Sequence, residues 1–124
     1  MPARRRALIA LSLILGGCET PSRDTGPDPS ITPARIEAAK QSCFACLGDS
    51  IRQLDDRISP ANVVGEQVHG MCAAQCRELF SLQARSQSRD PDYLRGAVSE
   101  IAEACPSIAT SAVLTSRTKR QQGK

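Results

Sequence analysis

Aromatic side chains are almost absent from this 124-residue chain, which contains two phenylalanines, one tyrosine and no tryptophan. The chain therefore offers no stacking platform for nucleic-acid bases. It also lacks a glycine-rich phosphate loop. Its single histidine, His69, lies one helical turn before Cys72, but the sequence places no third group that would orient the two as a catalytic pair. The longest apolar run, residues 7–15, would rise only about 14 Å as a helix, too little to span a bilayer. We expect no catalytic residue and no nucleic-acid partner.

The first eighteen residues have the layout of an export signal, with Arg4, Arg5 and Arg6 ahead of the apolar run and Leu-Gly-Gly-Cys behind it. This ending, at residues 15–18, resembles the lipobox of bacterial lipoprotein precursors. The resemblance implies that residues 1–17 are removed as a signal peptide. It also implies that Cys18 carries diacylglycerol and an acylated amino group, with chains such as palmitate. Two or more acyl chains give stable membrane attachment.

The residue after the lipobox cysteine bears on the location. In the resembling family an Asp there implies inner-membrane retention, and this chain has Glu19. We therefore expect a lipid-anchored protein on the periplasmic face of the outer membrane. Removal of residues 1–17 would take away three of sixteen basic and none of thirteen acidic residues, so the mature chain carries no net charge. This again disfavours nucleic acid as a partner.

The composition divides the mature chain into three parts. Residues 18–33 are rich in Pro, Gly, Ser, Thr and Asp, which predicts a lipidated cysteine followed by a disordered tether. Residues 34–116 form the expected helical, cysteine-rich domain. Residues 117–124 carry four basic side chains and are expected to be a flexible basic tail.

Apolar spacings of three and four predict three helices in the domain. Thr32-Pro33 is typical of a helix start, and the first helix is predicted from Pro33 to about Ile58, where Ser59-Pro60 breaks it. The second is predicted from about Val63 to Arg85, capped by Asn62 or Ser59. The third follows Asp90-Pro91 and stops near Pro106. Residues 107–116 are expected to form a short fourth helix or a strand, and we favour the helix.

The cysteine positions predict how the first two helices pack. In an antiparallel hairpin, residues at equal height have numbers with a constant sum. Cys43 with Cys76 sums to 119 and Cys46 with Cys72 to 118, and both place the turn near residue 59, where proline independently places it. These are therefore the predicted disulfides among the three connectivities that four cysteines allow. Cys105 is expected to be unpaired and buried on the apolar face of the third helix.

Two other uses of the four thiols remain open. Cys43, Cys46, Cys72 and Cys76, with His69 nearby, could bind Cu(I) or Zn²⁺ between the helices. The second use is thiol–disulfide catalysis, which needs a cysteine of low pKa, usually at a helix N-terminus. The CFAC motif lies about ten residues inside the first helix, so its position disfavours this use. Adjacent Asp55 and Asp56 are expected to form a solvated face.

The sequence thus predicts an all-α domain, a disulfide-stapled antiparallel hairpin with a third helix in a bundle of three or four helices. It is expected to lack a pocket and not to be an enzyme. The function that fits is an envelope-anchored protein-interaction or accessory factor, such as a pilotin-like chaperone or a secretion or conjugation accessory. The alternative is a periplasmic copper- or zinc-binding protein; otherwise no cofactor is expected.

Overall fold

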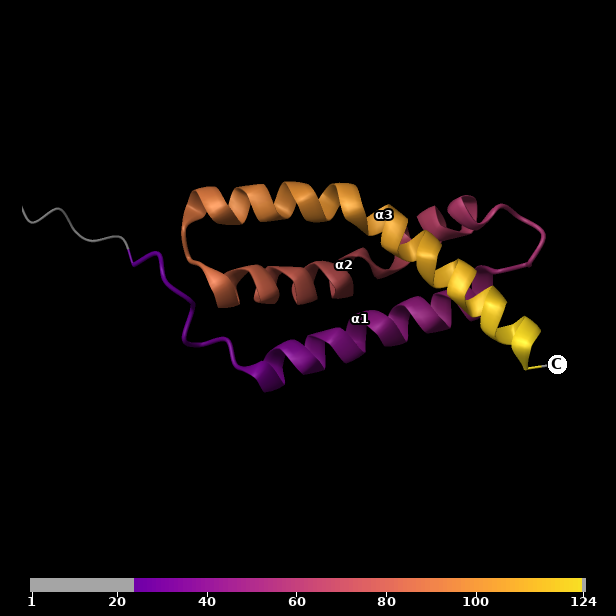
Figure 1. Ribbon diagram of the computed structural model, residues 1–124, viewed down its shortest axis with the longest axis horizontal. Helices are drawn as coiled ribbons and strands as arrows, with labels where there is room; N and C mark the ends of the chain where they lie inside the picture. Colours follow the sequence, from indigo (N-terminus) through magenta and orange to yellow (C-terminus); the bar gives the residue numbers. More distant parts are fainter. Residues whose placement is uncertain (1–23, 124) are drawn as a thin grey trace, which may run out of the picture.

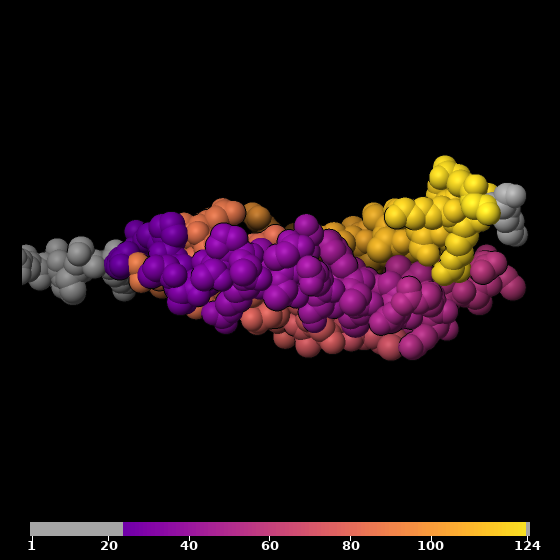
Figure 2. Space-filling view, turned by 90° about the horizontal axis from the view of Figure 1, so that it is seen from below, coloured from indigo at the N-terminus to yellow at the C-terminus, as the bar shows by residue number. Residues whose placement is uncertain are grey.

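The computed structural model describes residues 24–123, which form three helices and no strand (Figure 1). The helices are α1 (Pro33–Leu54), α2 (Ala61–Gln87) and α3 (Pro91–Gln122). Both α1 and α3 pack along α2 and touch each other little, so α2 is the central element. The space-filling view shows an elongated molecule with α1 in front (Figure 2). The predicted all-α class and the stapled hairpin are confirmed.

Helix α1 begins as predicted and ends earlier than predicted. The Thr32 hydroxyl accepts a hydrogen bond from the Arg35 amide at 3.2 Å, and Pro33 occupies the first turn. The predicted end near Ile58 is wrong, because the side chains of Asp55 and Asp56 accept hydrogen bonds from backbone amides two or three residues later. Such local bonds compete with the helical pattern.

Helix α2 is two residues longer at each end than predicted, and neither expected cap is used. Pro60 stands at its N-cap position and no side chain caps it. Asn62 lies inside the helix, while the Ser59 hydroxyl donates to Asp56 at 2.7 Å. The missing amide of proline has no cost at a helix start, where amides lack helical partners.

Helix α3 continues through Pro106, so the predicted stop there is wrong, and residues 107–116 are neither a separate helix nor a strand. Ala109 and Val113 are 1% and 0% exposed, and their burial against α2 offsets the proline's cost of about 3 kcal/mol. The Pro106 carbonyl accepts a hydrogen bond from the Thr110 hydroxyl at 3.0 Å. Figure 1 shows the helix changing direction near its middle, where this proline lies.

Both expected flexible segments are partly ordered. Residues 117–122 are the last turns of α3 and not a flexible tail. Within the predicted tether, residues 24–31 pack against the connection between α2 and α3. The Asp28 amide donates to the Arg85 carbonyl at 3.0 Å, their side chains form an ion pair at 2.6 Å, and Ile31 is buried. This segment has few apolar side chains to bury, and its backbone hydrogen bonds to the end of α2 and the following connection stabilise its position instead.

Two glycines of α2 have contrasting surroundings. A Cβ atom on Gly65 would lie 2.8 Å from both the backbone N and the Cα of Thr110, so α2 and α3 approach each other closely at this position. A Cβ atom on Gly70 would meet nothing within 4 Å. Gly65 is therefore required by packing, and Gly70 only weakens the helix.

We predict opposite effects of alanine at these two positions. Gly65→Ala should lower the free energy of unfolding by about 2 kcal/mol, because α3 must shift to admit the methyl group. Gly70→Ala should raise it by about 0.5–1 kcal/mol through helix propensity. Urea unfolding followed by circular dichroism measures both, and equal changes in the two variants would contradict the close approach of α2 and α3.

Candidate functional site

Two disulfides join α1 to α2 in the predicted pairing. Cys43 is bonded to Cys76 and Cys46 to Cys72, with Cα–Cα separations of 4.7 Å and 5.8 Å. All four residues lie inside helices, at spacings of three in α1 and four in α2 that place each pair on one helix face. In the chain-entropy model the outer loop of 34 residues contributes about 3 to 4 kcal/mol.

The structure also places the other residues of the proposed metal site. His69 lies on α2 and lines a cavity between the helices, whereas the four cysteine sulfurs are held in disulfides. Among residues 24–123, no group of three or more His, Cys, Asp or Glu side chains is placed to hold a metal ion. A Cu(I) or Zn²⁺ site made of Cys43, Cys46, Cys72 and Cys76 would need both disulfides to be reduced first.

Cys105 is the free cysteine of the described region, and it is buried as predicted. Burial raises the pKa of its thiol, and the nearby charge of Arg77 opposes this only in part. A thiol of raised pKa is a poor nucleophile at neutral pH. The lipidation residue, Cys18, lies outside the described residues, as does the expected signal peptide.

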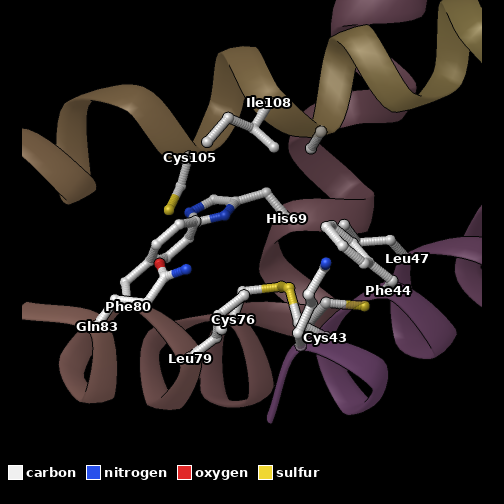
Figure 3. A pocket seen from close by; sticks show the side chains of 13 residues that line it. Cys43, Phe44, Leu47, His69, Cys76, Leu79, Phe80, Gln83, Cys105 and Ile108 are labelled. Carbon is white, nitrogen blue, oxygen red and sulfur yellow. A yellow bond between two sulfur atoms is a disulfide. The ribbon is translucent and has the colours of Figure 1, made fainter. Parts of the chain in front are cut away.

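An apolar cavity of about 240 Å³ lies between the three helices, contrary to the expectation of a domain without a pocket. We call it the apolar cavity. It exists because α1 and α3 both pack on α2 without closing on each other. Figure 3 shows side chains of all three helices lining it: Phe44 and Leu47 from α1, His69 and Phe80 from α2, and Cys105 and Ile108 from α3.

A second hollow, which we call the basic groove, adjoins the apolar cavity. The two share Phe44, Leu47 and Ile108 in their walls, so they form one continuous depression between α1 and α3. The basic groove measures about 480 Å³ and is more open. Its charged lining residues are all basic: Arg52, Lys119 and Arg120.

The connection between α1 and α2, residues 55–60, is an ordered loop that we call the distal loop. The Asp56 carboxylate accepts hydrogen bonds from the Ser59 hydroxyl and from the amides of Ser59 and Ile58, which lower the pKa of Asp56 to about 2. Arg57 has a φ of 64°, unusual for a residue other than glycine. These constraints hold Ile58 outward, where it is 90% exposed.

A buried ion pair connects the distal loop to α3. The Asp55 side chain is fully buried, and Arg117 donates to it at 2.6 Å and to the Ser59 carbonyl at 2.8 Å. The expected solvated face is therefore wrong for Asp55. The Arg117 hydrogen bonds hold the pKa of Asp55 below its ordinary value of 3.8, despite opposing desolvation. This pair could not be predicted from the sequence, because the third helix was expected to end before Arg117.

No family model, no curated protein and no solved structure matches this chain. Within residues 24–123, none of the helices is long and apolar enough to cross a membrane.

The Asp55–Arg117 pair predicts a specific dependence of stability on pH. Because the pKa of Asp55 is lower in the folded state, its contribution is complete above the ordinary value of 3.8 and is lost as the pH falls through the folded value. We expect Asp55→Asn to lower the Tm at pH 7 by about 5 °C and to flatten the fall of Tm below pH 4.

Asp49→Asn is the matched control, because Asp49 is also in an ion pair, with Arg52, but its side chain is 60% exposed. Exposed pairs contribute little, so its Tm at pH 7 should stay close to that of the parent protein. Equal losses of Tm in the two variants, measured by calorimetry, would show that burial of Asp55 has no special effect.

Proposed function

We propose that this protein is a small accessory factor of the cell envelope that is anchored by lipid and binds a partner protein through its distal loop. The observation that carries this proposal is Ile58, a large apolar side chain that is 90% exposed on an ordered loop. Exposed apolar groups on rigid supports suit recognition, since little conformational entropy is lost when they are buried. Val63, in the first turn of α2, is also partly exposed, at 42%.

The arrangement of the two ends supports this role. Residues 24–28 are held by Arg85, Ser88 and Arg89, at the connection between α2 and α3. The distal loop lies at the opposite end of the elongated molecule (Figure 1). A lipid on Cys18 would therefore attach one end to the membrane and leave Ile58 at the end that points away from it.

The charge around the distal loop indicates the character of the partner. Arg57 and Arg120 line a depression there together with Arg117, whose charge is balanced by Asp55, and the two arginines outnumber the exposed carboxylate of Asp56. An apolar tip beside basic side chains complements a partner surface that combines an apolar pocket with acidic groups. A pilotin-like chaperone or an accessory of secretion or conjugation would use such a contact with a larger envelope assembly.

Copper or zinc handling is the second candidate function. It rests on the same four cysteines, and the structure holds them in disulfides. The oxidised state favours a structural role for these residues in the oxidising envelope.

We predict that Ile58→Ser removes most of the partner binding. The variant and the parent, both full-length, are expressed in the source cell and crosslinked with formaldehyde, and recovered partners are quantified by mass spectrometry. Loss of one central apolar contact typically costs more than 1 kcal/mol, so recovery of the specific partner should fall about tenfold. The fold should persist, because Ile58 has almost no contacts to lose.

The control is Leu114→Ser, which changes an apolar side chain of α3 that is 52% exposed and lies outside the distal loop. Recovery of the partner should be unchanged in this variant. The same partner recovered in equal amounts from Ile58→Ser and the parent would rule out the distal loop as the binding surface.

A further inference from the structure

The depression between α1 and α3 has two chemically different parts, and of their lining residues only Arg120 also belongs to the proposed contact surface around Ile58. The apolar cavity is lined mainly by carbon and sulfur atoms, with the polar side chains of Lys40, His69 and Gln83 also among its lining residues. The basic groove continues from it and is flanked by Lys119 and Arg120. We propose that the two parts together bind a single-chain anionic amphiphile, with its hydrocarbon chain in the apolar cavity and its charged head group at Lys119 and Arg120.

The size and lining of the apolar cavity suit a hydrocarbon chain. Its volume of about 240 Å³ exceeds the roughly 150 Å³ that accommodates a benzene ring in a protein core. The side chains of Phe44, Leu47 and Ile108 supply apolar walls, and Phe44 and Ile108 are 53% and 40% exposed. A bound chain would remove these exposed carbon atoms from water, which is the main driving force for such binding.

The position of the basic residues matches the length of such a molecule. Ile108 borders both hollows, and Lys119 lies eleven residues further along α3, about 17 Å along the helix axis. An extended chain advances roughly 1.2 Å per bond, so about fourteen bonds cover this distance, and the long side chains of Lys119 and Arg120, which lean toward the N-terminus of α3, shorten it. No acidic residue lines either hollow, so nothing there opposes a negative head group.

A protein helix fits this site less well than a single chain. A helix with its side chains is about 10 Å wide, whereas the apolar cavity has a volume of about 240 Å³ and is floored by α2. Only one side chain of a docked helix could enter it. The small volume of the apolar cavity therefore favours an unbranched chain over a protein helix.

Cys105 provides a local reporter, because this free thiol lines the apolar cavity. The purified full-length chain, unreduced, is incubated at mildly alkaline pH, where more of the buried thiol ionises, with dodecanoate, tetradecanoate or hexadecanoate below the micellar concentration and treated with N-ethylmaleimide. The ligand-free chain gives the reference rate. Alkylation of the peptide that contains Cys105 is followed by mass spectrometry. We expect each carboxylate to slow this alkylation, with the half-maximal concentration falling about tenfold per two added methylene groups.

Three variants test the assignment of the two parts. Ile108→Trp, which narrows the apolar cavity, should weaken protection by dodecanoate at least tenfold, while Leu114→Trp, outside both linings, should leave it unchanged. The double change Lys119→Gln and Arg120→Gln should weaken protection by dodecanoate about tenfold and leave that by neutral dodecanol unaltered. Comparing dodecanoate with a lysophosphatidylglycerol of equal chain length then shows whether a free fatty acid or a phospholipid is preferred.

Several results would overturn the proposal. The first is no protection of Cys105 by any amphiphile, above all if Cys105 is nevertheless protected in intact cells, since a protein helix would then be the occupant. The second is equal protection by dodecyltrimethylammonium, whose head group is cationic. The third is a result in which Lys40→Gln, at the other side of the apolar cavity, weakens protection by dodecanoate while the double variant of Lys119 and Arg120 does not. None of these measurements involves a partner protein, so their outcome is independent of the role of Ile58.

Discussion

The covalent connection of α1 to α2 by two disulfides is the constraint on which the rest of this structure depends. The core is small: the buried apolar side chains of residues 24–123 are aliphatic residues, alanines and cysteines, with no aromatic ring among them. The net stability of a folded domain is only about 5 to 15 kcal/mol. The bond between Cys43 and Cys76 contributes about 3 to 4 kcal/mol, which is of this order, by restricting the unfolded chain. The two disulfides therefore hold α1 against α2 independently of the contacts with α3.

Helix α3, in contrast, is held by noncovalent contacts alone, and their distribution shapes the surface. Gly65 allows α3 to approach α2 closely, and the ion pair between Asp55 and Arg117 connects the last turns of α3 to the distal loop. Helix α3 packs on α2 but makes few contacts with α1, and the space between α1 and α3 forms the apolar cavity and the basic groove. A rigid hairpin with a third helix attached along one side can thus keep a hollow that a fully packed bundle would fill.

The sequence predicted the features that follow from local spacing. The starts of α1 and α3 were correct because Thr32-Pro33 and Asp90-Pro91 carry their own capping chemistry, and the disulfide pairing was correct because hairpin register is an arithmetic constraint. Features that depend on tertiary contacts were missed. Pro106 was taken as a helix end because the burial of Val113 cannot be seen locally. The apolar cavity was missed for the same reason, since it depends on where the other helices lie. The exposure of Ile58 was missed because local hydrogen bonds to Asp55 and Asp56 end α1 earlier than its apolar spacing predicts.

The measurement that tests this account most directly is a peptide map of the unreduced protein by mass spectrometry. The account predicts two crosslinked species, one joining the peptides of Cys43 and Cys76 and the other those of Cys46 and Cys72, with Cys105 recovered as a free thiol. A link between Cys43 and Cys46, or four free thiols that bind a metal ion, would contradict it, because the hairpin would then lack the covalent support on which the rest of the structure depends.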